Sequence, residues 1–295
     1  ERYAEAVEQL GDKKAPVRMG GVYTLIGLAD EWLLDENLDY AERVREGQVI
    51  INNLCACIRS SFALAFHYNE LTQDSPTAEG LYKNREQEFY TDKAALESEA
   101  NIRLSIIQEI RHRLQGPDKN TPGTWSGFEY DFSGSTFFYP VDLTNSYYAK
   151  PAAFDNAVYK AWANFSGSHY CGDADFSYSD YGGDTDFSYS TYQGRADFRA
   201  STYAGEAYHR GSSYTDTVDF SDSVYKGRAI FSRATYQGKA NFSGSRYQDE
   251  AHFYFSTYQE ADFSGATYQA PTDFSYSTYR GAADFRRSAY RAGAD

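Results

Sequence analysis

The chain contains 295 residues, with 42 acidic and 28 basic side chains and a net charge of -14. This excess of negative charge excludes bulk electrostatic attraction to nucleic acid or to anionic lipid. Hydrophobic residues make up 41% and charged residues 24%, as in a soluble protein, but Phe supplies 20 and Tyr 28 residues whereas Met occurs once. Such a bias indicates a repeat, because an ordinary core mixes its apolar side chains.

The cysteines and the apolar segments bear on the location of the chain. Cys55, Cys57 and Cys171 form no CxxC pair, which predicts neither a disulfide framework nor a zinc site and favours a reducing cytoplasm. No run of 18 or more apolar residues could span a bilayer. Because the first residue is Glu rather than Met, we expect a cytoplasmic protein whose membrane tether, where there is one, lies on an upstream segment absent from this chain.

The first 120 residues predict an α-helical domain. Helices are predicted over residues 2–10, from Pro16 onward, at about 40–62 and at about 91–114, on apolar spacings of three and four. Two starts that each pair an apolar residue with Arg, at Val17 and at Ile102, favour stacked HEAT-like hairpins. The polar segment 63–90 is predicted to be a long surface excursion, with a functional lid as the alternative.

Composition changes near residue 120. Leu, Ile, Val and long charged side chains precede this point, whereas Phe, Tyr, Ser, Ala, Asp and Gly follow it. Turn-forming residues gather between Gly116 and Gly123. The sequence therefore predicts two domains, residues 1–120 and residues 121–295.

The second part is governed by a period of eleven residues. A Phe series runs from Phe132 to Phe285, with Leu143 and His209 in two of its slots, and every step is eleven except one of ten. A series of mostly Tyr, from Phe137 to Tyr290, follows each member by five residues. Small residues precede the aromatics by two positions, mostly Ala before Phe and Ser before Tyr.

This pattern predicts a β-solenoid with a filled interior. Alternate residues of an extended segment point the same way, so each aromatic and its small partner face inward. Sides of five and six residues alternate, and four sides close one coil of two eleven-residue units. Glycines two residues after Tyr mark the corners of the longer sides, where we expect a permissive backbone. About 7.5 coils at roughly 4.8 Å give a rod on the order of 36 Å long.

Several segments match a five-residue motif of Ala, Asp or Asn, then Leu or Phe and two variable residues. They include Ala174-Asp175-Phe176-Ser177-Tyr178 and Ala240-Asn241-Phe242-Ser243-Gly244. In this the chain resembles the bacterial pentapeptide-repeat proteins over residues 130–290, and residues 2–23 look like the helical segment that precedes the repeats in many members. The resemblance implies a right-handed quadrilateral β-helix. In such members a membrane-anchoring hairpin can lie further upstream.

The tyrosine register raises a question of hydrogen bonding. A buried hydroxyl without a partner costs about 1–3 kcal/mol. The Ser residues two positions before Tyr are candidate partners, directly or through water. The alternative is that the hydroxyls reach solvent at the wider corners.

One face of the predicted rod carries an acidic ladder just before the Phe slots. Its aspartates are candidate binding residues: Asp131, Asp175, Asp197, Asp219, Asp262 and Asp284. The functional interpretation is DNA mimicry, since some pentapeptide-repeat proteins linked to quinolone resistance resemble B-DNA and occupy the DNA site of gyrase. The structural interpretation is that Asp and Asn accept hydrogen bonds from the turn backbone.

Charge density favours the structural interpretation of the ladder. Residues 126–295 hold 21 acidic and 14 basic side chains, which leaves a net charge of -7. Spread over the expected length this is roughly one charge per 5 Å, against one per about 1.7 Å in duplex DNA. Mimicry of DNA toward gyrase is therefore the alternative hypothesis.

Catalysis has little support in the sequence. The five histidines are scattered, and His209 occupies a Phe slot, which favours a satisfied interior histidine over a ligand. No spacing typical of a metal site, a phosphate-binding loop or a nucleophile elbow occurs in the required context. We expect no catalytic residues, no metal and no cofactor, and hence no enzyme.

Outward aromatics give the remaining expectation. Tyr189, Tyr254 and Tyr276 lie at irregular outward positions and are candidate binding residues, with ladders that only stiffen the rod as the alternative. We expect a non-enzymatic interaction or scaffold protein whose partner is a protein or a second copy of the chain, with no direct binding of nucleic acid and with gyrase as partner under the alternative hypothesis.

Overall fold

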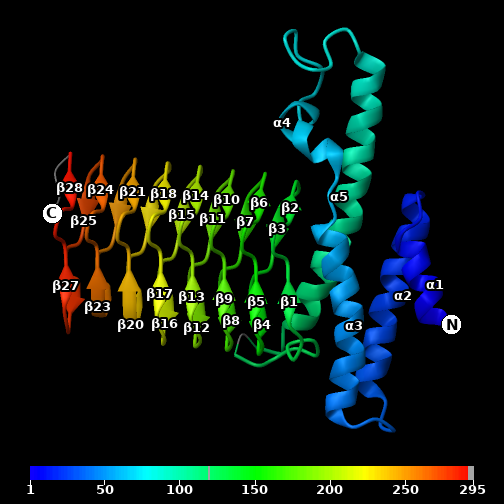
Figure 1. The fold of residues 1–295 in the computed structure, drawn as a ribbon, viewed down its shortest axis with the longest axis horizontal. Helices are drawn as coiled ribbons and strands as arrows, with labels where there is room; N and C mark the ends of the chain where they lie inside the picture. Colours follow the sequence, from blue (N-terminus) through cyan, green and yellow to red (C-terminus); the bar gives the residue numbers. More distant parts are fainter. Residues whose placement is uncertain (119, 292–295) are drawn as a thin grey trace. The chain divides into compact units, whose positions relative to one another are not determined.

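The computed structural model describes residues 1–118 and 120–291. It divides into two compact units, Glu1–Glu109 and Ile110–Asp295, so the division falls within the last predicted helix rather than near residue 120. The helices are α1 (Arg2–Leu10), α2 (Ala15–Leu34), α3 (Tyr40–Arg59), the 3-10 helix η1 (Ala63–His67), α4 (Tyr68–Leu71) and α5 (Glu86–Leu114). They are coloured from blue to green in Figure 1.

The predicted helices are present, but the segment after α3 differs from the prediction. It contains η1 and α4 and is therefore not a loop throughout, and α5 begins at Glu86 rather than near residue 91. Ala65, Leu71 and Tyr82 of this segment are buried, and the Tyr82 hydroxyl donates to an Asp92 carboxylate oxygen at 2.8 Å. These buried residues are too few and too widely spaced to show a helical period in the sequence.

Buried charge links three helices of the first unit. Glu99 on α5 accepts from Arg18 on α2 and from Arg103 Nε at 2.8 Å. Arg103 also donates to the carbonyl of Ile58 at the end of α3, at 2.8 Å. Removal of one member would leave an uncompensated buried charge, which is strongly destabilising.

The second unit is a parallel β-solenoid of about seven turns, with strands stacked in layers from green to red in Figure 1. Its described strands form four ladders, here named faces 1 to 4. Face 1 consists of β1 (Tyr130–Asp131), β5 (Ala152–Ala153), β9 (Ala174–Asp175), β13 (Ala196–Asp197), β17 (Val218–Asp219), β27 (Ala283–Asp284) and the second halves of β20 (Thr235–Asn241) and β23 (Thr257–Asp262). Face 2 consists of β2 (Thr136–Phe137), β6 (Val158–Tyr159), β10 (Asp180–Tyr181), β14 (Thr202–Tyr203), β18 (Val224–Tyr225), β21 (Arg246–Tyr247), β24 (Thr267–Tyr268) and β28 (Ala289–Tyr290).

The remaining strands complete the four sides of each coil. Face 3 consists of β3 (Val141–Asp142), β7 (Ala163–Asn164), β11 (Thr185–Asp186), β15 (Ala207–Tyr208), β19 (Ala229–Ile230), β22 (Ala251–His252) and β25 (Thr272–Asp273). Face 4 consists of β4 (Tyr147–Tyr148), β8 (His169–Tyr170), β12 (Thr191–Tyr192), β16 (Ser213–Tyr214), β26 (Thr278–Tyr279) and the first halves of β20 and β23. Ala174 pairs with Ala196 and Thr191 with Ser213, which confirms that two eleven-residue units make one coil.

The interior is filled by stacked rings. Phe154 and Phe176 lie 4.8 Å apart at an angle of 1°, and Tyr170 and Tyr192 lie 4.8 Å apart at 2°. The two Phe columns meet edge to face, with Phe165 and Phe176 at 5.2 Å and 74°. Both geometries are favourable for aromatic pairs, so each coil packs against its neighbours through the rings as well as through backbone hydrogen bonds.

The serine residues before Tyr join neighbouring coils, and they do so through the backbone. Ser190 Oγ accepts from the Ser168 amide at 3.2 Å and donates to the Phe165 carbonyl at 3.2 Å. Ser179, Ser201, Ser223 and Ser256 repeat this pair of bonds. The serine hydroxyls therefore serve the backbone of the neighbouring coils, and a bridge from Ser to the Tyr hydroxyl, directly or through water, stays a prediction.

The tyrosine hydroxyls do not lie at the surface, so the alternative expectation, that they reach solvent at the wider corners, is wrong. Their oxygens are buried, and among the described residues the hydroxyls of the following tyrosines form no hydrogen bond: Tyr159, Tyr170, Tyr181, Tyr192, Tyr203, Tyr225, Tyr236, Tyr247, Tyr258 and Tyr268. Burial raises the pKa values of the Tyr181 and Tyr192 hydroxyls well above the usual range of a phenol. Only neutral phenols therefore occupy this interior at any ordinary pH.

The corner glycines are required by close approach and not by backbone angle. None of Gly172, Gly194 and Gly238 has a positive φ. A Cβ at Gly194 would lie 2.7 Å from the carbonyl carbon of Gly172 in the preceding coil, and one at Gly238 would lie 2.5 Å from that of Asp216. The predicted position is right, but the physical reason is that adjacent coils nearly touch at this corner.

The left-handed residues lie at the other corners, those that follow faces 1 and 3. Each is two residues after a Phe slot, and in some of these turns a hydrogen bond closes the turn, as where the Ser135 amide donates to the Phe132 carbonyl at 3.2 Å. The set comprises Gly134, Asn145, Asn156, Gly167, Tyr178, Tyr189, Ala200, Gly211, Asp222, Arg233, Gly244, Phe255, Gly265, Tyr276 and Arg287. Gly and Asn suit this conformation, whereas Tyr and Phe are strained in it.

Candidate interaction surfaces

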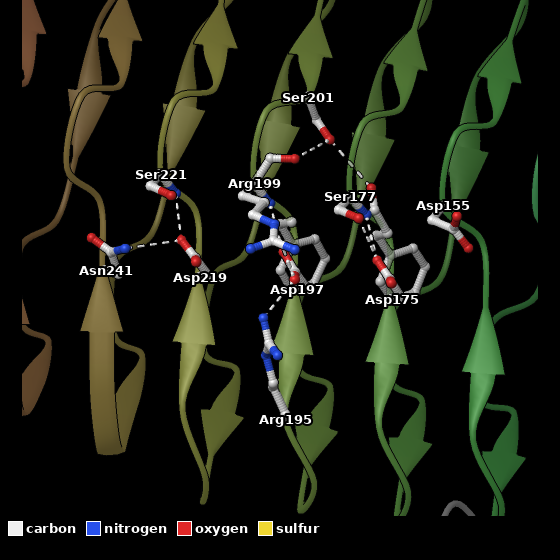
Figure 2. Close-up of polar contacts among 12 residues, drawn as sticks. Asp155, Asp175, Ser177, Arg195, Asp197, Arg199, Ser201, Asp219, Ser221 and Asn241 are labelled. Atoms are coloured by element: carbon white, nitrogen blue, oxygen red, sulfur yellow. Dashed lines mark hydrogen bonds and ion pairs between the residues drawn. The ribbon is translucent and has the colours of Figure 1, made fainter.

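The aspartates of the predicted acidic ladder lie on face 1, in register from coil to coil. Asp175 pairs with Asp197, and Asp197 with Asp219, in neighbouring strands. Figure 2 shows these carboxylates turned toward the following corner rather than toward a common point in solvent. Asp131, Asp262 and Asp284 occupy the equivalent positions of β1, β23 and β27.

Each of these aspartates accepts a hydrogen bond from the turn that follows it. Asp175 Oδ1 accepts from the Ser177 amide at 3.0 Å and from its hydroxyl at 2.6 Å. The amides of the residues two positions after Asp131, Asp197, Asp219, Asp262 and Asp284 donate in the same way at 2.9–3.2 Å. This is the Asx-turn geometry expected under the structural interpretation of the ladder.

Basic side chains pair with several aspartates of the ladder. Asp197 pairs with Arg195 at 2.9 Å and with Arg199 at 3.4 Å (Figure 2). Asp262 pairs with Lys239 at 3.8 Å, and Asp284 pairs with Arg286 at 2.6 Å. Asp197 is buried, and burial raises its pKa despite the two arginines. The ladder is therefore an element of the fold with a small field of its own.

A second surface lies at the corner between faces 3 and 4, where exposed rings occupy left-handed positions. It is named here the aromatic edge and comprises Tyr189, Arg233, Phe255 and Tyr276. The Phe255 and Tyr276 rings stack at 4.9 Å and 11°, and the Arg233 guanidinium lies 5.4 Å from the Phe255 ring centre. Tyr189 lies over Gly211, where a Cβ would meet its ring atoms at 2.8 Å.

The aromatic edge is well exposed, and the sequence identified it only in part. Tyr189 and Tyr276 are 57% and 79% exposed, as expected for binding residues, whereas Tyr254 is half-buried and packs its ring edgewise against His252 and Phe255 at 5.8 Å. The ring presented beside it is Phe255, at 50% exposure. The available signal was its place two residues after Phe253, a position that holds Gly or Asn in seven of the other fourteen repeats.

The remaining exposed aromatic of this kind, Tyr178, lies at a different corner. It follows face 1, and the Arg199 guanidinium lies 5.6 Å from its ring centre. Tyr178 therefore does not extend the aromatic edge.

The histidines are part of no metal cluster within the described residues, where no group of three or more His, Cys, Asp or Glu is placed to hold a metal ion. His209 is fully buried in its Phe slot, between Phe187 at 4.9 Å and Phe231 at 5.0 Å. His169 stacks on Tyr147 at 4.7 Å on face 4. That the chain is not an enzyme stays a prediction.

Membrane-spanning potential is limited to one bent segment. In the described part of the chain no single helix is long and apolar enough to cross a membrane, and only α3 taken together with the segment Ala63–Leu71, at a bend of 45°, meets that test. Ile50, Leu54 and Ile58 of α3 are buried inside the protein.

Comparison with known proteins adds no assignment to these surfaces. No protein-family model matches the chain, and no curated protein matches it. A function for the chain therefore has to be inferred from the chemistry of the solenoid surface.

Proposed function

We propose that this chain is a pentapeptide-repeat protein that acts without catalysis, as a rigid scaffold whose aromatic edge binds a protein partner. The repeat of the motif over residues 130–290 and the 22-residue register of the coils support the family assignment. The filled interior means that a ligand has to bind on the outside. The single observation that carries the proposed role is the aromatic edge.

The rings of the aromatic edge are carried by residues in a left-handed backbone conformation. Tyr189, Phe255 and Tyr276 have φ of 58°, 57° and 55°, a conformation that costs a residue with a Cβ about 1–2 kcal/mol. The same corner accepts Gly167 and Gly211 at equivalent positions. These large, exposed residues therefore reduce the stability of the free protein through backbone strain. Residues with backbone strain of this kind gather at binding sites.

The composition of the aromatic edge suits a protein partner. Tyr and Arg are enriched among the residues that dominate binding energy, and Phe is enriched at interface centres. The rings are already fixed by stacking and by Arg233, so little side-chain entropy is lost when they bind. A convex corner of this shape requires a groove on the partner.

The test replaces the rings with a residue that suits the left-handed turn. A triple variant, Tyr189→Asn, Phe255→Asn and Tyr276→Asn, is compared with the control Tyr178→Asn at the other corner. We expect the wild type and the control to capture the same specific protein from the native host and the triple variant to lose it, with β-rich circular dichroism unchanged in all three. Equal capture by all three would refute the role of the aromatic edge, and ring-dependent self-association in sedimentation would assign it to a second copy of the chain.

DNA mimicry toward gyrase is the alternative proposal, and it requires a strongly anionic face. Asp197, Asp262 and Asp284 on face 1 have basic partners, which weakens the field that such a mimic would need. A supercoiling assay with gyrase separates the two proposals. Inhibition or protection at micromolar protein would favour the mimic over the scaffold.

A further inference from the structure

Face 4 presents two columns of uncharged polar side chains. The residues just before the inward Tyr form the first column: Thr191, Ser213, Thr235, Thr257 and Thr278, each paired with the next. Two positions later along the chain, the second column holds Gln193, Thr215, Gln237 and Gln259, all exposed. In β20 and β23 the strand continues past the inward Tyr, so alternation places the two columns on the same side of the backbone. Strand spacing repeats both columns at about 4.8 Å.

This face differs from the other three in charge. Its two outward columns contain no charged residue from Tyr147 to Gln259, and the first is Arg280. Face 1 carries the aspartates, face 3 carries Asp142, Asp186 and Asp273, and face 2 carries Asp180 and Arg246. In a solenoid of net charge -7, face 4 is the neutral side.

The hydrogen-bonding groups of face 4 are not used within the protein. Among the described residues no side-chain hydrogen bond involves the hydroxyls of Thr191, Thr235 and Thr257 or the amides of Gln193 and Gln237. The serines of the turns behave differently, since Ser177 and Ser133 donate to the aspartates before them at 2.6 Å. Face 4 therefore holds donors and acceptors that remain free for a ligand.

We propose that face 4 binds a neutral polysaccharide that lies along the axis of the solenoid. Hydroxyl and amide groups match the hydroxyls of sugars, and the lack of charge removes any electrostatic attraction to a phosphate- or carboxylate-bearing polymer. An array that repeats once per coil fits a periodic chain better than one small molecule.

The same features argue against a globular protein on this face. Protein interfaces concentrate binding energy in a desolvated apolar centre with aromatic or Arg anchors, and the columns of face 4 contain none between Thr191 and Gln259. A polymer instead gains from many weak contacts made at once, because each further sugar binds at a high effective concentration. Affinity should therefore rise steeply with the length of the glycan.

The experiment measures retention of the full chain by microcrystalline cellulose, by chitin, and in gels that contain amylose or glycogen. The variant Thr191→Asp with Thr257→Asp places two charges on face 4. Its control, Thr202→Asp with Thr267→Asp, makes the same change in the same slot of face 2, where Asp180 already shows that the slot accepts Asp. All four threonines are half-buried.

We expect at least one of these glycans to retain the wild type and the face 2 control, and the face 4 variant to bind it more than tenfold more weakly. A long oligosaccharide should compete, whereas its disaccharide should not. No retention of the wild type by any of the four glycans would overturn the proposal, as would equal losses in both variants. Self-association that only the face 4 variant abolishes would assign the face to a second copy. Because these outcomes do not involve Tyr189, Phe255 or Tyr276, they are independent of the protein partner proposed for the aromatic edge.

Discussion

His209 offers a direct test of the packed aromatic interior. Its imidazole is fully buried in a Phe slot, stacked between Phe187 and Phe231 and edge-on to Phe198 and Phe220 at 4.9 Å. Its only described polar neighbour is the Tyr214 hydroxyl, 3.3 Å from Nδ1. Burial lowers the pKa of His209 from 6.5 to about 3, because a charged ring cannot be solvated among phenyl rings.

The sign of the pH effect follows from this lowered pKa. Between pH 6.5 and pH 3 the unfolded chain binds a proton at residue 209 and the folded chain does not, so the free energy of unfolding falls as pH falls. The slope is about 1.4 kcal/mol per pH unit, which amounts to about 2 kcal/mol between pH 6.5 and pH 5. Above pH 6.5 both states are neutral at this residue and the term disappears.

The variant His209→Phe should remove this pH dependence and restore the ring that the repeat places elsewhere. We expect it to be more stable than the wild type, with an advantage that grows by about 2 kcal/mol from pH 6.5 to pH 5. Denaturant unfolding of both proteins at several pH values measures this, and the difference between them cancels the titration of all other groups. An advantage that stays constant with pH would refute a buried, neutral His209.

Three further predictions address the corners and the links between coils. Ser190→Ala should lower the free energy of unfolding by about 1 kcal/mol, since it leaves the Ser168 amide and the Phe165 carbonyl without their bridge; an unchanged denaturation midpoint would contradict this. Gly194→Ala should be strongly destabilising because its Cβ would meet Gly172 at 2.7 Å. Gly27→Ala in α2, with open space around it, should instead raise the free energy of unfolding by about 1 kcal/mol; the melting curves of the two variants, each compared with the wild type, test both expectations. Ala200→Gly should stabilise by about 1 kcal/mol, because Ala200 has a φ of 54°, and a lower melting temperature would count against strain at this turn.

The sequence predicted the core of the solenoid well because the core repeats. Inward slots such as Phe176 and Tyr192 recur every eleven residues and need only fit their own column, so periodicity alone locates them. The hydrogen bonds of Ser190 could not be predicted in the same way. They join residues 22 and 25 positions apart, and that register is known only once four sides are known to close one coil.

The candidate binding residues were harder to predict because they lie where the repeat varies. Asp175 and Asp197 recur, and their recurrence reflects a turn that every coil needs. Phe255 was missed because its left-handed conformation is a property of its slot, visible only when Gly134 and Asn145 are aligned with it. Residue type alone therefore located the aspartates on one face but not the exposed ring of Phe255.

The one ten-residue step in the repeat shows how far the outer surface is independent of the core. The segment from Tyr258 to Phe263 lacks the corner glycine found at Gly238, and the pairing of β20 with β23 shifts register between Tyr236 and Lys239. The aromatic columns continue through this shift, with Phe242 and Phe263 stacked at 4.8 Å and Tyr236 and Tyr258 at 4.7 Å. The core therefore tolerates the loss of a whole residue at the corner between faces 4 and 1, although a Cβ added at that corner on Gly238 would lie only 2.5 Å from the carbonyl carbon of Asp216 in the neighbouring coil.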